Sequence, residues 1–429
     1  APYGIALRFD AFGAWALPMC VLFALIVPYL GRSMRGTLPA ARWAPLHALL
    51  LANLGGMIGF AISGDLFDLF VFMEIVALSS YALVAIGGRG AAAWAALEYL
   101  MIGAVSSLLM LLGVALLFVQ TGSLDLLDVA DRLGTAAGAA TGPAMTGFAL
   151  LATSFLIKAA LFPLHAWLPG AHAIAPSPVS AVLSGMVVKV GLIGMLRLYQ
   201  LAERSGAFGL DAFQAVLVAL GSVSIVMGAF LAMFQDDVKL MLAYSTISNV
   251  GYIVLGLGLA SPYALLGGAV HVFNHALIKT TLFLAVGALI HGTGRRTLHD
   301  LRGVARSMPY SAGALAIGAI AIVGLPPTAG FVCKWYIALG AFQAGRGVFG
   351  AVLVFGALFI FVYFVRMVNA FYFQAPVHPE VKEAREAPWA MRAPLLILAT
   401  LCLAMGVLGG IPIGFVEPAI LDLLPAWGP

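Results

Sequence analysis

Charge is the property that this 429-residue sequence has least of. Only 9% of its residues are charged, against roughly 25% in an ordinary soluble domain, while 62% are hydrophobic. A soluble chain of this length could bury a large core, but so few polar residues could not cover its surface. The composition excludes a soluble globular protein and indicates an integral membrane protein.

Other absences narrow the class further. The three cysteines, Cys20, Cys333 and Cys402, are far apart and have no metal-ligand spacing. No glycine-rich phosphate loop follows a strand, and the short alternating strands of an outer-membrane barrel are missing. The net charge of +4 does not indicate nucleic acid, because basic loops account for it. We therefore expect no metal, no cofactor, no nucleic-acid partner and no chemical active site in this chain.

Apolar runs of about 20 residues, long enough to cross a bilayer as a helix, recur from end to end. They predict an all-α polytopic membrane protein with about twelve transmembrane helices. The expected spans are 10–30, 43–62, 66–86, 95–119, 145–162, 177–200, 212–234, 239–259, 263–291, 312–342, 349–374 and 393–411.

The loops between these spans predict the orientation. Alternating the spans places twelve basic residues on one side: Arg32, Arg35, Arg42, Arg89, Lys239, Arg295, Arg296, Arg302, Arg306, Lys382, Arg385 and Arg392. The other side receives Arg8, Arg132, Arg204 and Arg346. Because basic loops stay in the cytoplasm, the first side is expected to be cytoplasmic and both termini of this chain to face outward.

Several ionisable residues fall inside the spans, where each charge costs roughly 2.5–3.5 kcal/mol. They are Glu74, Lys158, Lys189, His271, His275, Lys279 and Lys334. Such groups ordinarily face a hydrated interior and move ions or protons; the alternatives are structural ion pairs or side chains that snorkel to the interface. Arg197 and Arg366 lie nearer span ends, where snorkelling is the simpler reading.

Local spacing favours the proton-transfer reading. His271, His275 and Lys279 recur at every fourth residue and would line one helical face over about 12 Å. Histidine titrates near neutral pH, and such a row can pass protons through intervening water. The alternative is a set of packing polar groups that bond across helices.

Prolines accompany two of these lysines. Pro163 follows Lys158 in SFLIKAALFPLHAWLPGAHAIAPSPVSA, and Pro326 and Pro327 precede Lys334 in GLPPTAGFVCKWY. Non-helical backbone at membrane depth is tolerated only where protein or water satisfies it, and interrupted helices mark ion sites in many transporters. We therefore expect two broken helices, one in each half of the chain.

These motifs, together with FVFMEIVALSSYAL, DDVKLMLAYSTISNVGYIVLGLGL and HVFNHALIKTTLFLAVGALI, resemble the antiporter-like subunits of respiratory complex I. The same family includes the large subunits of Mrp-type cation/proton antiporters and of membrane-bound energy-converting hydrogenases. The resemblance covers residues 8–410, and the wording around Glu74 and Lys334 resembles the Mrp D-type chain most.

The resemblance implies a bundle of about fourteen helices with two inverted five-helix repeats, each containing a broken helix. It divides this chain into an N-terminal helix and cytoplasmic loop (1–42), a first repeat (43–200), a second repeat (201–374) and a cytoplasmic loop with the last helix (375–429). It also implies that two helices precede this chain, which begins with Ala1. One departure is Glu98 in AALEYLMIG, where the family commonly has lysine.

The resemblance further implies that the seven ionisable residues transfer protons at mid-membrane, with Glu74 tuning Lys158. It places the chain in a multi-subunit complex of a prokaryotic cell membrane, with other membrane subunits as partners and Na⁺ as a possible second ion. Because the complex could be an oxidoreductase, it stays open whether this chain is a subunit of an enzyme. The alternatives are a self-sufficient transporter for Na⁺ or another solute, and an anchor that moves nothing.

The proton-transfer reading makes a geometric prediction. Isolated charges are costly, so the side chains should converge in one hydrated interior. The expected order is Glu74, Lys158, Lys189, the histidines with Lys279, and then Lys334.

Overall fold

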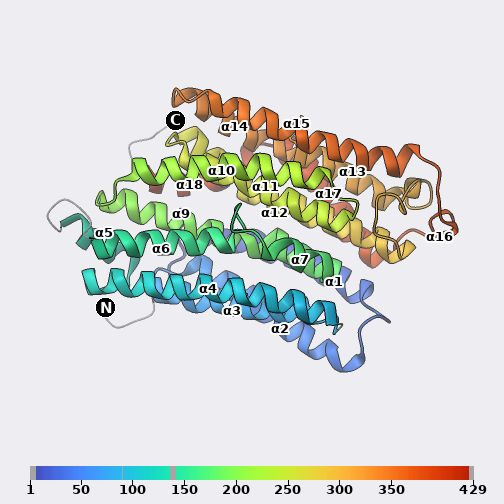
Figure 1. The fold of residues 1–429 in the computed structure, drawn as a ribbon, viewed down its shortest axis with the longest axis horizontal. Helices are drawn as coiled ribbons and strands as arrows, with labels where there is room; N and C mark the ends of the chain where they lie inside the picture. Colours follow the sequence, from blue (N-terminus) through green and yellow to red (C-terminus); the bar gives the residue numbers. More distant parts are fainter. Residues whose placement is uncertain (1–5, 89, 136–141, 425–429) are drawn as a thin grey trace.

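A computed structural model of the chain describes residues 6–88, 90–135 and 142–424. Within these ranges it is almost entirely helical, which confirms the all-α membrane protein (Figure 1). Ten helical segments of the described chain are long and apolar enough to cross a membrane. They are Gly13–Ser33, Ala40–Ile62, Leu66–Ala85, Gly90–Thr121, Ser177–Ser205, Leu210–Met233, Val238–Gly258, Pro262–Thr293, Val348–Phe373 and Trp389–Val407.

The two remaining expected spans are not continuous helices: 145–162 stops being helical after Lys158, and 312–342 is divided between two shorter helices. Residues 159–166, which include Pro163, separate α6 (Gly142–Lys158) from α7 (Trp167–Ile174). Residues 324–328, which include Pro326 and Pro327, separate α13 (Pro309–Val323) from α14 (Ala329–Gln343). With 17, 15 and 15 residues, α6, α13 and α14 are each shorter than the roughly 20 residues of a typical transmembrane helix, so neither expected span is one of the ten long segments.

The chain in both breaks leaves the helical region of backbone space. Ala160 has a φ of 55° and Gly324 a φ of 90°, the left-handed conformation that stops a right-handed helix. The carbonyl of Ile157 accepts two hydrogen bonds, from the Ala160 nitrogen at 3.0 Å and from the indole of Trp167 at 2.9 Å. Protein groups thus satisfy backbone that the first break exposes at membrane depth.

The other helices complete a single bundle. They are α1 (Ala16–Ser33), α2 (Trp43–Ile62), α3 (Leu66–Ala85), α4 (Gly90–Thr121), α5 (Leu126–Thr135), α8 (Ser177–Val182), α9 (Val188–Ser205), α10 (Leu210–Met233), α11 (Val238–Gly258), α12 (Pro262–Thr293), α15 (Val348–Val368), α16 (Pro379–Lys382), α17 (Trp389–Val407) and α18 (Gly410–Leu423). Short 3-10 segments are η1 (Gly13–Trp15), η2 (Ala40–Arg42) and η4 (Val304–Arg306), and π-helical turns are η3 (Leu183–Val187) and η5 (Asn369–Phe373).

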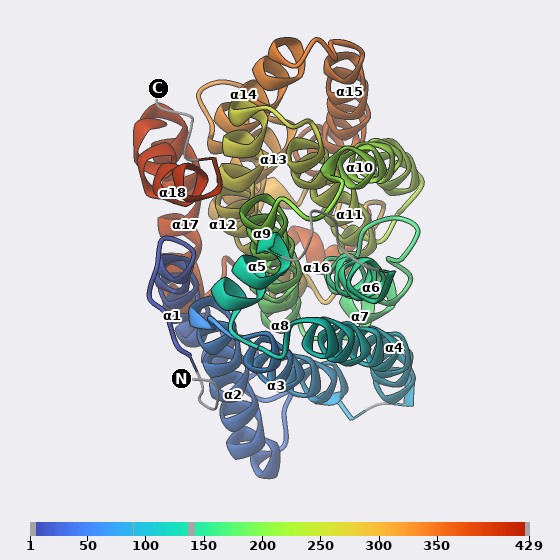
Figure 2. The ribbon, with the colours of Figure 1, turned by 90° about the vertical axis from the view of Figure 1, so that its left-hand side faces the viewer.

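Helix α12 lies at the centre of the bundle. It packs against α1, α8, α11, α13, α14, α17 and α18, so that nearly all of its side chains are buried. Viewed along the bundle, α1 to α4 lie on one side of this centre, and α10, α14 and α15 lie on the other (Figure 2). Helix α12, which belongs to the expected second repeat, therefore contacts helices of both expected repeats. That the two groups are inverted repeats stays a prediction.

Ion pairs tie the connecting segments at each end of the bundle. At one end Arg8 pairs with Asp125, and Arg204 pairs with Asp131 at 2.9 Å. At the other end Arg296 pairs with Asp237, and Arg295 with Glu380 at 3.1 Å. The basic loops expected to be cytoplasmic thus gather at the second end; Arg89 lies outside the described residues.

Three details differ from the sequence expectations. The segment after Asp125 forms a helix, α5, since Asp125 accepts hydrogen bonds from the next helical N–H groups. A further helix, α18, follows the last expected span. Arg197 does not snorkel: its side chain is 4% exposed and pairs with Asp10, because the N-terminal segment folds back over the end of α9.

Candidate functional site

Glu74 of α3 and Lys158, the last residue of α6, face each other inside the first half of the bundle. The Lys158 Nζ lies 3.9 Å from the Glu74 Oε1, and the hydroxyl of Ser107 on α4 connects them. Ser107 donates to the carboxylate and lies 3.3 Å from the lysine nitrogen. The Glu74 side chain is 28% exposed and that of Lys158 only 9%, so the pair runs from the helix surface into the interior.

The position of Lys158 follows from the break. Because α6 stops there, the lysine extends from a helix end into a space lined by α3 and α4, where the Tyr81 hydroxyl and the Gly103 carbonyl each lie 3.4 Å from Nζ. Helix α9 packs directly against this break. A Cβ added at Gly191 would lie 2.6 Å from both the Ala159 nitrogen and the Phe155 oxygen.

Lys189 and His275 form the next direct contact of the polar row. The Lys189 Nζ lies 3.1 Å from the His275 Nδ1 and also donates to the carbonyl of Ser184. Both side chains are fully buried between α9 and α12. The carbonyl of Ser184 belongs to the π-helical turn η3, which immediately precedes the α9 segment that carries the lysine.

The polar face of α12 packs against polar groups of α11. His271 Nε2 lies 3.2 Å from the Asn249 Oδ1, and the rings of His271 and His275 are 5.6 Å apart. Lys279 donates to the Leu242 carbonyl at 2.8 Å and to the hydroxyl of Ser245. Every ionisable group on this face therefore has a partner on a neighbouring helix, as buried polar groups require.

Lys334 of α14 lies at the far end of the row, beside the second break. Its Nζ donates to the carbonyls of Ile322 and Val323, the last two residues of α13, at 2.8 and 3.0 Å. These carbonyls are free because the helix ends there, and they form the negative end of its dipole. The same nitrogen lies 4.3 Å from the ring centre of Tyr252, and the ring centres of Tyr252 and His271 are 6.2 Å apart.

The seven predicted residues thus come together in two connected groups. Glu74 with Lys158 forms one, and Lys189 with the α12 residues and Lys334 forms the other. No hydrogen bond in the described ranges joins Lys158 to Lys189. The two groups are nevertheless adjacent, because α9, which contains Lys189, packs against the break that follows Lys158. In the second group, His275 lies between His271 and Lys279 along α12. Lys334 is near His271 and not near Lys279, so the row divides at His275 into one arm towards Lys334 and another towards Lys279.

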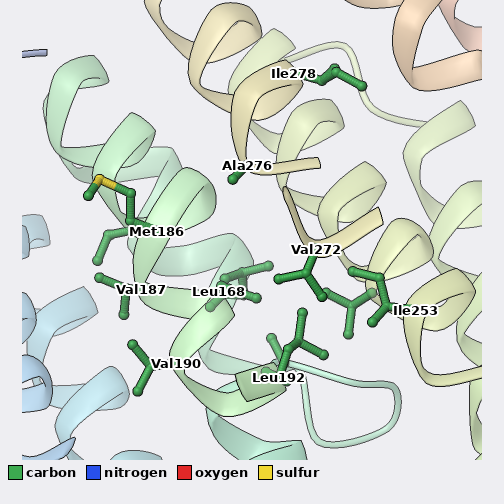
Figure 3. Packing of buried hydrophobic residues seen from close by; sticks show 14 of the residues in the cluster. Leu168, Met186, Val187, Val190, Leu192, Ile253, Val272, Ala276 and Ile278 are labelled. Atoms are coloured by element: carbon green, nitrogen blue, oxygen red, sulfur yellow. The ribbon is translucent and has the colours of Figure 1, made fainter. Parts of the chain in front are cut away.

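Apolar side chains pack on the same helices that carry the central part of the row. Leu168 of α7, Val190 and Leu192 of α9, Ile253 of α11 and Val272 of α12 belong to the buried hydrophobic cluster (Figure 3). Each of the five is at most 2% exposed, so the row lies within a largely apolar interior.

Two further buried ionisable residues belong near the row, although the sequence did not single them out. His172 on α7 is fully buried and stacks on Phe283, and neither of its ring nitrogens has a hydrogen-bond partner among the described residues. Lys239, expected at the cytoplasmic start of the span 239–259, is 4% exposed and donates to the carbonyl of Ala175. The signal for His172 was its place in the proline-rich motif; nothing in the sequence distinguished Lys239 from a loop lysine.

A cavity lies at the end of the bundle that carries the basic loops, and Ile174, two residues after His172, is part of its wall. It has a volume of about 500 Å³, and its walls include Ser33 of α1, Pro176 and Ser177 before α8, and His291 of α12. Glu98, whose role the resemblance left open, is partly buried on α4 and faces α7 at Gly170. It does not join the row.

Comparison with known proteins places this arrangement in a family. Residues 63–361 match the family model described as "NADH:quinone oxidoreductase/Mrp antiporter, TM". The chain is 38% identical to NADH-quinone oxidoreductase subunit N of Desulforudis audaxviator, over 95% of this chain and 82% of that protein. It is 29% identical to the D component of the Na(+)/H(+) antiporter of Alkalihalophilus pseudofirmus, over 95% and 81%.

Solved structures agree with this assignment. A chain of the membrane-bound sulfane sulfur reductase, an archaeal respiratory membrane complex, superposes with a TM-score of 0.89 at 32% identity, covering 98% of this chain and 84% of that one. The interrupted helices, the buried row of ionisable residues and these similarities lead to one conclusion. The chain belongs to the family of antiporter-like membrane subunits shared by NADH:quinone oxidoreductases and Mrp antiporters.

Proposed function

We propose that this chain moves protons across the membrane as one subunit of a multi-subunit complex. The observation that carries the proposal is the buried row of ionisable groups between two interrupted helices. A purely structural anchor would gain nothing from buried ionisable groups on separate helices, each of which is costly in a membrane. Relatives named as subunits of NADH-quinone oxidoreductases and Na(+)/H(+) antiporters support the same reading.

In this mechanism the lysines and histidines pass protons by hydrogen-bond exchange. Lys189 and His275 are already within reach, whereas no direct hydrogen bond joins His271 to Lys334 in the described residues, so a proton between them needs a bridging water. The gap between Lys158 and Lys189 likewise requires water. Protonation of Lys158 is favoured while Glu74 is charged and close, so any movement of Glu74 changes when the lysine releases its proton.

Glu74 also supports the proposed assembly. Its neighbours Val71, Ile75 and Leu78 on α3 are each at least 38% exposed, so the carboxylate opens onto a surface that would otherwise face lipid. A partly exposed carboxylate at this depth is costly unless another protein covers it. We therefore infer that a neighbouring membrane subunit packs on α3 and senses or shifts the charge of Glu74.

The basic loops give the proposed orientation. They gather at the end of the bundle that contains residues 295–306 and 374–388, which we assign to the cytoplasm; both termini then face outward from a prokaryotic cell membrane. The 500 Å³ cavity lined by Ser33, Pro176 and His291 lies on the cytoplasmic side in this orientation. Which energy source drives the complex, and whether Na⁺ moves as well, depends on its partner subunits.

Replacing Lys158 tests the proposal. In membrane vesicles that contain the whole complex, Lys158→Ala and Lys158→Arg should both abolish proton movement measured with a pH-sensitive dye, while the complex still assembles. Arginine keeps the charge but does not release its proton in proteins. The matched control is the exposed Lys382, where Lys382→Arg and Lys382→Ala should transport normally.

Two results would separate the alternatives. Full transport by Lys158→Arg would show that the lysine is not a proton carrier and favour an anchor with locally paired charges. Proton or Na⁺ flux by the wild-type chain reconstituted alone would favour a self-sufficient transporter.

A further inference from the structure

Outside the membrane row, one group of three side chains has the composition of a metal site. His299 and Asp300 follow α12, and His378 precedes α16; His299 is exposed and the other two are half-buried. One potential ligand atom from each lies within 4.8 Å of the others. The described ranges contain no other group of three or more His, Cys, Asp or Glu residues that meets this spacing.

The carboxylate of Asp300 lies between the two imidazoles. The Asp300 Oδ1 lies 3.0 Å from the His378 Nε2 and 3.6 Å from the His299 Nδ1. Two ligands of a tetrahedral Zn²⁺ ion are separated by about 3.4 Å, because Zn–N and Zn–O bonds are about 2.0–2.2 Å. Both separations from Asp300 are close to that value, so only the two imidazoles must approach each other for all three to bind one ion.

The backbone holds these residues in place without the ion. The two segments that carry them are joined by hydrogen bonds from the Gly303 nitrogen to the Ala370 oxygen at 2.9 Å and from the Ser307 hydroxyl to the Val381 oxygen at 2.7 Å. Asp300 is oriented locally, since its own nitrogen donates to the Thr297 hydroxyl at 3.1 Å. Preorganised ligands lower the entropy that metal binding has to offset.

The surrounding charges also permit a cation. Two guanidinium groups of the same connection are occupied by other carboxylates, because Arg295 pairs with Glu380 and Arg296 with Asp237. The side chains of Asp300 and His378 are 27% and 28% exposed, which leaves a path from solvent and room for a water molecule as fourth ligand.

We propose that His299, Asp300 and His378 bind a single divalent transition-metal ion of the zinc class at the loop end of the bundle. The set of two imidazoles and one carboxylate suits Zn²⁺ and other first-row ions that bind nitrogen, but not Mg²⁺ or Ca²⁺, which prefer oxygen ligands. The ion replaces the hydrogen bond between His378 and Asp300, so the coordinating nitrogen of each histidine is unprotonated.

Binding would cross-link two connections that lie 78 residues apart in the sequence. One follows α12, the helix that carries His271, His275 and Lys279; the other joins α15 to α17. An ion at this place would restrain the loop end of the central helix relative to the outer helices. The inference concerns binding alone and does not depend on proton transfer.

Metal titration of the full chain tests the site directly. Protein purified without a polyhistidine tag and stripped with chelator should bind one Zn²⁺ per chain in equilibrium dialysis, with micromolar affinity. Co²⁺, used as a spectroscopic probe, should show the intense visible bands of tetrahedral coordination. His299→Ala, Asp300→Asn and His378→Ala should each weaken binding by at least ~10-fold.

The matched control is His47→Ala. His47 is also exposed at the loop end of the bundle, where its Nδ1 lies 2.8 Å from the Trp43 oxygen, and this variant should bind Zn²⁺ like the wild type. Thermal unfolding of each variant shows whether it is folded. The proposal is overturned if wild-type protein binds no stoichiometric Zn²⁺ at micromolar concentrations, or if the three ligand variants bind as tightly as His47→Ala.

Discussion

Gly191→Ala should disable the polar row without touching any of its ionisable groups. The added Cβ would lie 2.6 Å from the Ala159 nitrogen and the Phe155 oxygen, about 0.8 Å inside ordinary contact. Both atoms belong to the backbone at the break of α6, so neither can rotate away. Helix α9 must therefore move away from the break, and Lys158 and Lys189 are the side chains on either side of that contact.

The magnitude follows from two separate costs. Overpacking of this kind destabilises a protein by about 1–3 kcal/mol, which a large bundle tolerates. A displacement of about 1 Å between reacting groups can cost ~100-fold in rate. We expect proton movement in vesicles to fall ~10–100-fold, while the complex still assembles and its thermal unfolding temperature falls only slightly.

Gly55→Ala on α2 is the matched control, because a Cβ there meets nothing within 4 Å. Normal transport by this variant would show that an added methyl group in a membrane helix is harmless by itself. Wild-type rates for Gly191→Ala would refute the reasoning, since they would mean that the spacing of α6 and α9 does not set the distance that a proton must cross.

Two further substitutions test the ends of the argument. Glu74→Gln should uncouple transport because it removes the negative charge that lies 3.9 Å from the Lys158 nitrogen, whereas Glu74→Asp should retain part of the transport. Proton flux per turnover of the complex measures both variants. An equal loss in the two would show that geometry matters more than charge. Asn249→Leu should slow proton movement, because it leaves a buried His271 nitrogen without its partner at 3.2 Å, a loss of about 1–3 kcal/mol; unchanged flux in vesicles would show that Asn249 does not orient the imidazole.

The sequence predicted most of the fold because its strongest signals are local. Apolar length predicts a span, and a proline beside a lysine predicts where a span is interrupted, as at Pro163 and Pro326. Those signals need no knowledge of neighbouring helices. The short helix α5 was missed because Gly, Ala and Thr in the following segment resemble a loop, whereas the Asp125 cap decides the local structure.

Pairing across the bundle could not be predicted in the same way. Arg197 forms an ion pair with Asp10, which is 187 residues away in the sequence. Lys239 is buried because α11 packs against α7. The order along the row was only partly foreseeable for the same reason. Spacing on α12 placed three residues on one face, but which of them meets Lys189 depends on how α9 is rotated.

A metal site was not expected from the sequence, since only the cysteines were considered as ligands. His299 and Asp300 are adjacent, but their third neighbour, His378, is brought to them by the return of the chain after α15. Ligand sets that are completed by the tertiary fold leave no spacing pattern to read.

The direction in which the Lys189 side chain points depends on the number of residues in the π-helical turn η3. Such a turn accommodates one residue more than an α-helical turn, and each residue rotates a helix by about 100°. With the turn in place, the residue after Val188 points at His275. A relative that lacked one residue between Leu183 and Val187 would still carry the lysine in an aligned sequence, yet that lysine would point about a quarter-turn away from α12. Insertions and deletions here therefore change the direction of the Lys189 side chain even when every ionisable residue is retained.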